Sequence, residues 1–157
     1  MKTRLAGFVG SLSLLVPGAA LAADAQLMAP IHQFIDSFNK GDVKAAEAAY
    51  ASSVAIIDEV APYIWTGPGA FKAWASALMA DAKTRGDTDQ GVTVSDPIRE
   101  EVTGDRAYVV VPAVYAFKEK GAAMKEAGQM TFALLKGAAG WKIAGWTWTG
   151  PKAAPAS

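Results

Sequence analysis

The chain has 157 residues, balanced charges (15 Lys and Arg against 15 Asp and Glu) and no cysteine. Its basic residues are scattered rather than clustered, so a nucleic-acid-binding surface is not expected. Without cysteine there is no disulfide, thiol nucleophile or cysteine-ligated metal, and a single histidine excludes a multi-histidine zinc site. We therefore expect no metal, no cofactor and no nucleic-acid partner.

The first 22 residues have the features of a secretory signal peptide. Lys2 and Arg4 precede an apolar run from Leu5 to Val16, and the small residues Ala20 and Ala22 form a cleavage site. No later stretch reaches the roughly 20 apolar residues of a membrane helix. These features predict a periplasmic or secreted protein with no membrane attachment after cleavage.

Two helices are predicted next. Apolar residues recur at helical spacing over residues 27–38. Pro30 places the start of this helix near Ala29, because proline is tolerated only in the first turn. Asp42 is a suitable N-cap for an alanine-rich second helix over residues 43–50.

A short strand and a third helix follow. The β-branched residues within 54–60 predict a strand that Pro62 ends. The sequence Thr66-Gly67-Pro68 is typical of a helix start, and the apolar stripe after it fades at residues 83–86. The polar stretch 81–90 is interpreted as a loop.

The second half of the chain alternates between apolar and polar residues, which is the period of strands. The alternation begins at Val92 and Val94 and continues through Ile98, Glu100 and Val102 to a turn at residues 103–105. It then predicts strands over residues 106–118, 124–136 and 141–149. The mixed charges of residues 118–126 predict a solvated hairpin tip. The small, proline-containing segment 151–157 is predicted to be disordered.

Helices followed by a run of strands indicate an α+β fold. Several local motifs point to a more specific fold within this class. These motifs are Phe38-Asn39-Lys40-Gly41-Asp42, Tyr50-Ala51, Gly67, Gly104-Asp105-Arg106-Ala107 and Gly140-Trp141-Lys142-Ile143. In order and spacing, these motifs resemble the nuclear transport factor 2-like superfamily, which includes SnoaL-like polyketide cyclases and ketosteroid isomerases. The resemblance implies one cone-shaped domain over residues 27–149. In it, three N-terminal helices would pack on a curved antiparallel sheet around an apolar pocket.

Strand alternation assigns the residues of the last strand to two faces. If Trp141 and Ile143 point inward, Thr147 lies on the pocket wall, and Trp146 and Trp148 lie on the convex face. A β-bulge within the strand would reverse this assignment.

The same reasoning applies to the strand over residues 106–118. It places Tyr115 on the concave face, and Val110 and Val114 on the convex face. Together with Trp146 and Trp148, these valines would form an apolar surface too large for a solvated monomer. The pattern therefore predicts a homodimer that forms through the convex face.

Asp58 is the candidate catalytic residue. It is an acid in an apolar strand, and the resemblance places it where ketosteroid isomerases carry the aspartate that moves a proton. Burial in an apolar pocket would raise its pKa, which suits a general acid or base near neutral pH. The alternative is that Asp58 lies at a strand end, solvated or bonded to nearby backbone.

The remaining isomerase site does not match. The resemblance implies an oxyanion hole built from a tyrosine on the first helix and a protonated acid on a late strand. Phe34 stands at the tyrosine position and cannot donate, and the acid position falls near Thr131. Steroid isomerisation is therefore not expected, and enolate chemistry would need another donor such as Tyr63, Tyr115 or Gln129.

Further residues are candidates for ligand binding. His32 lies on the helix that lines the pocket in this fold, where it could shuttle protons or be a surface residue. Tyr63, Trp65 and Tyr115 could line the pocket or belong to the core, whereas Trp74 is assigned to the core.

Three functions are compatible with these features. The first is a periplasmic protein that binds a small apolar molecule in the central pocket. The second is an isomerase, cyclase or dehydratase that uses Asp58 as a general acid or base. The third is a non-catalytic dimeric assembly module.

Overall fold

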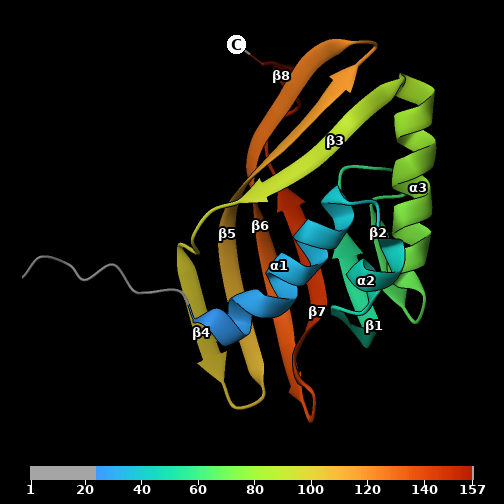
Figure 1. Cartoon of the computed structure of the whole chain (residues 1–157). Helices are drawn as coiled ribbons and strands as arrows, with labels where there is room; N and C mark the ends of the chain where they lie inside the picture. The colour runs from blue at the N-terminus through green and yellow to red at the C-terminus, as the bar shows by residue number, and fades with distance from the viewer. Residues whose placement is uncertain (1–23, 157) are drawn as a thin grey trace, which may run out of the picture.

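The computed structural model describes residues 24–156, so the signal peptide predicted for residues 1–22 lies outside the described residues. This part of the chain contains three helices and eight strands (Figure 1). The helices are α1 (Ala25–Asn39), α2 (Val43–Glu47) and α3 (Ala70–Arg85). The strands are β1 (Tyr50–Ile57), β2 (Ile64–Gly67), β3 (Asp87–Val94), β4 (Arg99–Thr103), β5 (Arg106–Glu119), β6 (Ala122–Gly137), β7 (Gly140–Thr149) and β8 (Ala154–Pro155).

The strands form one sheet in the order β2-β1-β7-β6-β5-β3, with β4 also paired to β5 and β8 to β6. Strand β1 runs parallel to β7, and the other pairs are antiparallel. The prediction of a purely antiparallel sheet is therefore wrong at one pair. The error arises because β1 joins a strand that is remote in sequence, and no local pattern reveals that pairing.

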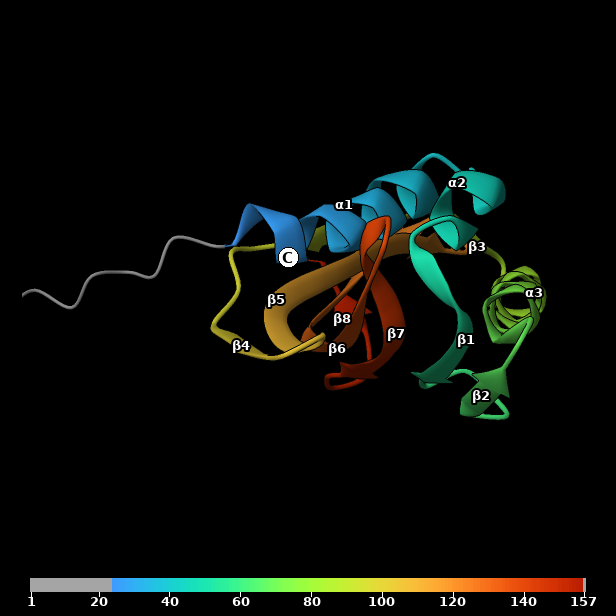
Figure 2. The same ribbon diagram turned by 90° about the horizontal axis from the view of Figure 1, so that it is seen from below.

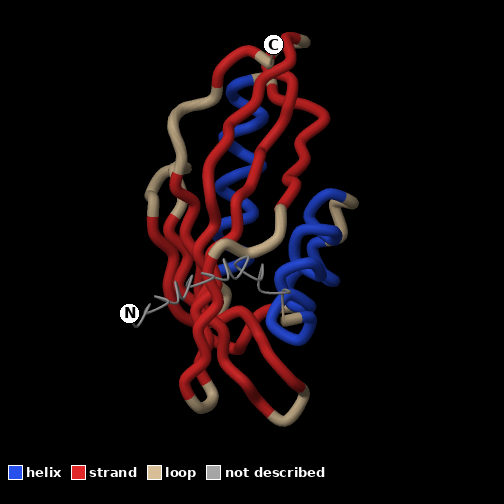
Figure 3. Tube along the Cα trace, turned by 90° about the vertical axis from the view of Figure 1, so that its left-hand side faces the viewer, coloured by secondary structure: helices blue, strands red, loops and turns tan. Residues whose placement is uncertain are grey.

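The sheet is curved, and α1 and α2 lie over it when the molecule is seen from below (Figure 2). Helix α1 packs on β3 and β7, whereas α3 contacts β1, β2 and β3. From the side, α1 stands on one face of the strand layer (Figure 3). The predicted α+β fold, with helices packed on a curved sheet, is confirmed.

Phe34 of α1 is the centre of an aromatic cluster that joins the helices to the sheet. Its ring makes edge-to-face contacts with Tyr50 at 5.3 Å and Trp74 at 6.0 Å, and it stacks on Trp146 at 5.8 Å. Trp146 also donates a hydrogen bond from Nε1 to the Tyr50 hydroxyl at 2.8 Å. Aromatic pairs contribute about 0.5–1.5 kcal/mol beyond their buried area, so this cluster fixes α1 and α3 against the sheet.

Helix α1 begins four residues earlier than the sequence predicted. The side chain of Asp24 caps it by accepting a hydrogen bond from the Gln26 backbone N–H at 2.8 Å, and Pro30 lies inside the helix. Proline lacks the N–H that would bond to the turn before it. The burial of Leu27 and Met28 in that early turn offsets this loss.

The structure also corrects the predictions around the third helix. The residues Thr66 and Gly67 belong to strand β2, and α3 begins only at Ala70, after Gly69 in the left-handed conformation (φ 80°). The predicted loop over 81–90 is instead the end of α3 followed by β3. The missed strand β2 and the missed first part of β3, residues 87–91, are specified by long-range pairing, of β2 with β1 and of β3 with β5.

Strand β7 contains a bulge that reverses its alternation. Ile143 pairs with Leu134 and Gly145 pairs with Ala133, so Ala144 is an extra residue in β7. The inward face after the bulge therefore carries Trp146, which is only 5% exposed, and the half-buried Trp148. The assignment of both tryptophans to the convex face, and of Thr147 to the pocket wall, is wrong for this reason.

Strand β5 keeps strict alternation, and its predicted concave residues are all buried. These residues are Ala107, Val109, Val111, Ala113 and Tyr115. On the convex side, Tyr108 and Val114 are exposed, whereas Val110 is buried outside the main core cluster.

Residues 154–156 take a defined place, although the composition of residues 151–157 predicts disorder. Strand β8 pairs with β6 at Met124 and Lys125, and the Ala156 backbone N–H donates to the Ala123 carbonyl at 2.9 Å. This short pairing holds the segment against the tip of the β5–β6 hairpin.

Candidate functional site

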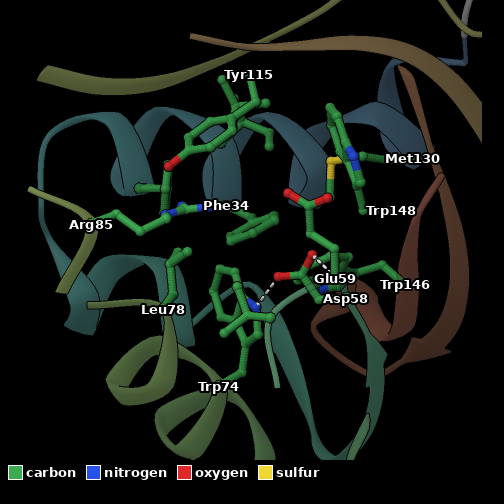
Figure 4. Close-up of a pocket in the computed structure, with 14 residues that line it drawn as sticks. Phe34, Asp58, Glu59, Trp74, Leu78, Arg85, Tyr115, Met130, Trp146 and Trp148 are labelled. Atoms are coloured by element: carbon green, nitrogen blue, oxygen red, sulfur yellow. Dashed lines mark hydrogen bonds between the residues drawn. The ribbon is translucent and has the colours of Figure 1, made fainter. Parts of the chain in front are cut away.

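A partly open space, here called the inner cavity, lies between α1, α3 and the concave face of the sheet (Figure 4). Its volume is about 50 Å³. Most of its wall is aromatic or aliphatic: Phe34, Ile35, Phe38, Val60, Trp74, Leu78, Val92, Tyr115, Met130, Trp146 and Trp148. Its charged wall residues are Asp58, Glu59 and Arg85.

A larger and more polar pocket, here called the outer vestibule, adjoins the inner cavity. Its volume is about 390 Å³. The two spaces share Glu59, Val60 and Arg85, and this boundary between them is here called the neck. The remaining walls of the vestibule are Ala61, Tyr63, Asp81, Phe117, Glu119, Met124, Lys152 and Ala153.

Asp58 follows β1 directly and lies in the wall of the inner cavity. Its Oδ2 accepts a hydrogen bond from Trp74 Nε1 at 2.6 Å, and its Oδ1 accepts from the Glu59 backbone N–H at 2.8 Å. Burial raises the pKa of the Asp58 carboxyl, the two hydrogen bonds oppose this shift, and the nearby Asp81 adds to it. The carboxylate is thus fixed in orientation, with its charged form disfavoured by burial.

Glu59 points its carboxyl group into the same space, toward Trp148 (Figure 4). Burial and the neighbouring Glu126 carboxyl raise the pKa of Glu59 to about 7, with a smaller contribution from Asp58 and an opposing one from Arg85. A carboxyl group in this range is partly protonated at neutral pH, so it can both donate and accept a proton.

Glu126 lies behind Glu59 on the concave face of β6 and is only 1% exposed. It accepts a hydrogen bond from Trp148 Nε1. A Cβ at Gly150 would lie 3.0 Å from Glu126 Oε1, so glycine leaves room for this bond. The buried pair of Glu126 and Trp148 supports the neck from behind.

Arg85 comes from the last turn of α3 and is held by acidic neighbours. Its Nη2 lies 2.7 Å from Asp87 Oδ2 and 3.2 Å from Asp81 Oδ2. Its guanidinium group also lies over the ring of Phe117, 5.6 Å from the centroid. The positive charge at the neck is therefore already balanced by two carboxylates.

Of the predicted site residues, the structure brings Asp58 and Tyr115 together at the inner cavity. The Tyr115 hydroxyl donates to Gln90 Oε1 at 2.6 Å, and burial raises the pKa of this phenol. Tyr63 is 61% exposed and lines only the outer vestibule. Asp58 accepts no hydrogen bond from Tyr63, Tyr115 or His32.

The other predicted residues lie outside both spaces. Trp65 is a core residue opposite Ile56, and His32 is exposed on the solvent side of α1. The bulge in β7 turns Thr147 away from the inner cavity. Gln129, a suggested donor for enolate chemistry, pairs with Thr149 and shares the outward parity of β6.

Glu59 and Glu126 are functional candidates that the sequence prediction missed. Glu126 was assigned to a solvated hairpin tip, but β6 already begins at Ala122. Alternation extended backward from the buried Met130 would have placed Glu126 on the concave face. No comparable signal marks Glu59, because it lies in a loop whose course depends on the packing around it.

Residues 24–156 contain neither a membrane-spanning helix nor a cluster of metal ligands. No helix there combines the length and apolar character that a membrane crossing requires. No group of three or more His, Asp or Glu side chains is arranged to hold a metal ion in that range.

Comparison with known proteins identifies relatives of the fold. The sequence profile of the SnoaL-like domain matches residues 27–147. No curated protein matches the chain in sequence.

Solved structures with the same fold differ widely in their descriptions. A ketosteroid isomerase-like protein from Erwinia carotovora atroseptica has 20% identity and a TM-score of 0.61, over 82% of this chain and 95% of that one. A type 2 hexachlorocyclohexane dehydrochlorinase has 11% identity and a TM-score of 0.68, over 82% and 88%. The CaMKII hub of S. rosetta has 20% identity and a TM-score of 0.66, over 87% and 100%.

Proposed function

This chain belongs to the SnoaL-like domain family, and we propose that it binds a small, largely apolar molecule at the inner cavity and the outer vestibule. The observation that carries the proposal is the aromatic wall of the inner cavity, interrupted by only three charged side chains. Ligand sites generally combine an apolar wall with a few oriented polar groups. The same fold serves both isomerase-like and dehydrochlorinase proteins among its solved relatives.

The volumes of the two spaces limit how such a ligand can lie. The inner cavity, at about 50 Å³, is small against the roughly 300–1,000 Å³ of typical ligand pockets. It has room for only a few water-sized groups, since one such group needs about 10–15 Å³ measured in this way. The ligand would therefore place a small group in the inner cavity and its larger part in the vestibule of about 390 Å³.

A thermal-shift series with small hydrophobic compounds tests this proposal. We expect compounds that fit to raise the melting temperature of the wild type, because they bind the folded state alone. Leu78→Phe narrows the inner cavity and should remove the shift. The matched control is Met79→Phe, which adds the same ring at the neighbouring, exposed position of α3. Absence of any stabilising compound, or equal shifts in both variants, would contradict the proposal.

A second candidate function is proton transfer by Asp58. It is favoured by the orientation of this carboxylate at the cavity and by its raised pKa. As a base, Asp58 would take a proton from the carbon next to a ketone, the C–H electron pair would form a C=C bond to the carbonyl carbon, and the C=O π pair would move to the oxygen. This candidate ranks second because the Tyr115 hydroxyl, a possible donor to that oxygen, is bonded to Gln90.

Deuterium exchange distinguishes the two functions. If Asp58 is a base, the protein should accelerate exchange of the α-protons of cyclohexanone in D₂O, as followed by NMR. Asp58→Asn keeps an oxygen that can accept from Trp74 but cannot take the proton, so it should abolish the acceleration. If the wild type does not accelerate this exchange, proton transfer is excluded and binding stays the only proposed function.

The location of the protein is part of the proposal. Residues 1–22 support export to the periplasm or the medium, as their composition predicts. Expression of the full chain in a bacterium with subsequent fractionation tests this. A mature protein that begins at Ala23 and is found outside the cytoplasm is expected, and an uncleaved cytoplasmic chain would contradict it.

The proposed homodimer now rests on a different set of side chains. The tryptophans point inward, so the exposed convex face of β5 offers Tyr108 and Val114 instead. Light scattering on the wild type and on Val114→Lys tests this surface. A wild-type dimer that the lysine converts to a monomer is expected, and a monomeric wild type would contradict it.

A further inference from the structure

The polar groups of the inner cavity are unevenly divided between donors and acceptors. Each of the three indole N–H groups in its wall is already engaged: Trp74 with Asp58, Trp146 with Tyr50, and Trp148 with Glu126. The hydroxyl of Tyr115, also in the wall, donates to Gln90. What remains for a ligand is the Glu59 carboxyl group, which lies beside Asp58 and shares a hydrogen bond with Glu126, and the buried Nε of Arg85, which has no partner among the described residues. A ligand group that enters the cavity therefore meets two carboxyl groups and one unpaired donor.

The distribution of charge at the neck favours a cationic ligand over an anionic one. Arg85 is paired with Asp81 and Asp87, so its charge is compensated by the protein itself. Glu59 faces Glu126 from β6 and Asp58 from its own segment, and the opposing effect of Arg85 on its pKa is smaller than theirs. A carboxylate ligand would add negative charge here, whereas a cation would relieve the repulsion.

The wall of the inner cavity is also largely aromatic, with the rings of Phe34, Phe38, Trp74, Tyr115, Trp146 and Trp148. Ring faces attract an ammonium group by about 0.5–2 kcal/mol, most strongly where water is excluded. A cavity of about 50 Å³ matches such a small head group better than it matches a ring system.

We propose that the ligand of this site is an apolar amine, whose ammonium head enters the inner cavity and pairs with the Glu59 carboxylate while its apolar body occupies the outer vestibule. This inference rests on the proposed small-molecule-binding function and specifies the ligand class. Glu59 is the recognition residue, and Glu126 is a positioning residue that acts on it from behind.

The proposed pairing couples binding to proton release. The groups facing Glu59 are Glu126 of β6, Asp58 beside it, Arg85 of α3 and Tyr115 of β5. Because the pKa of Glu59 is about 7, roughly half of the free protein carries this proton at pH 7. The ammonium group favours the carboxylate, so the proton leaves to the buffer and no other bond changes. Affinity for the amine should therefore rise about tenfold between pH 6 and pH 8, where an alkylamine remains protonated.

Isothermal titration calorimetry with hexylamine, hexanol and hexanoate tests the ligand class, since these compounds share a body and differ in the head. At pH 8, hexylamine should bind the wild type at least tenfold more tightly than hexanol, and hexanoate should bind most weakly. Hexanol binding as tight as hexylamine binding, or a preference for hexanoate, would overturn the inference while leaving the proposed function intact. If none of the three binds, the proposed function itself is contradicted.

Single substitutions test the roles proposed for Glu59 and Glu126. Glu59→Gln should bring the ratio of amine to alcohol affinity close to one and remove its pH dependence. Glu126→Gln keeps an acceptor for Trp148 and removes the acidic neighbour, so it should preserve the amine preference and move the pH midpoint below 7. Glu101→Gln, at an exposed position of β4 that lines neither space, is the matched control. Circular dichroism verifies the fold of each variant. An unchanged ratio in a folded Glu59→Gln would contradict the assignment.

Discussion

Strands β5 and β7 lie in one sheet, yet only β5 keeps strict alternation. Its inward positions over residues 107–115 are all buried, as alternation requires. In β7, the extra residue Ala144 turns Trp146 and Trp148 inward and Thr147 outward. A single added residue thus delivers two indole rings to the wall of the inner cavity.

The difference arises from what each strand lies against. The bulge in β7 occurs where this strand meets β1 in parallel pairing, opposite Ala55. A Cβ at Gly145 would lie 2.7 Å from the Ala55 carbonyl oxygen, so the two backbones approach more closely than a side chain allows. Strand β5 has antiparallel neighbours and continuous register with β6. The pattern of β7 is therefore decided by contact with a segment about 90 residues away, whereas that of β5 is local.

Replacement of the first inward tryptophan should have the largest effect on stability. Trp146→Ala removes a side chain that contacts Phe34 and Trp74 and donates to Tyr50, so we expect a loss of about 3–5 kcal/mol in the free energy of unfolding. Urea denaturation measures it, with Thr147→Ala on the outward face as the control. A loss below about 1 kcal/mol would contradict the inward position of Trp146 and would favour the convex face instead.

The close approach of β7 to β1 can be tested next. Gly145→Val places a branched side chain against the Ala55 carbonyl and should cost about 2–3 kcal/mol, because backbone cannot move aside as a flexible side chain can. Gly137→Val, where a Cβ meets no atom within 4 Å, is the matched control and should change stability by less than about 1 kcal/mol. If both variants lose the same free energy of unfolding in denaturant titrations, the close approach of β7 to β1 is not the origin of the bulge.

In β5, alternation itself can be measured. Val111→Ala deletes two buried carbons and should cost about 1.5–2 kcal/mol. The same change at Val114, which is 37% exposed, should cost less than about 0.5 kcal/mol. Similar losses for both variants would mean that β5 does not separate its faces as the structure indicates.

The smallest expected effect is a pH dependence at the neck, where Trp148 from the bulged strand bonds to Glu126. The pKa of Glu59 is about 7 in the folded protein and about 4.3 in an unfolded chain. The folded state therefore binds this proton more tightly, and its contribution to stability is present at low pH and is lost as pH rises toward and through 7. Melting temperatures measured between pH 5 and 8 should show this decline in the wild type and a weaker decline in Glu59→Gln. Identical slopes would contradict the raised pKa.

Much of the site could be predicted from the sequence where the signals are local. Asp58 and Tyr115 both line the cavity, the first predicted from an acid in an apolar strand and its family resemblance, the second from alternation along β5, and their roles stay predictions. Phe34, which is expected in place of a donor, lines the same cavity. Glu59 could not be predicted in this way, because its pKa depends on a carboxyl group from β6.

The sequence by itself determined the α+β class, the approximate limits of the long strands and the two faces of β5. These features follow from the spacing of apolar residues within short segments of the chain. Only the tertiary structure decided the parallel pairing of β1, the bulge at Ala144 and the meeting of Glu59 with Glu126. These three features depend on segments that are distant in sequence and are brought together by burial of the aromatic cluster. The physical reason is that backbone pairing and carboxyl pKa values respond to spatial neighbours, which local periodicity does not encode.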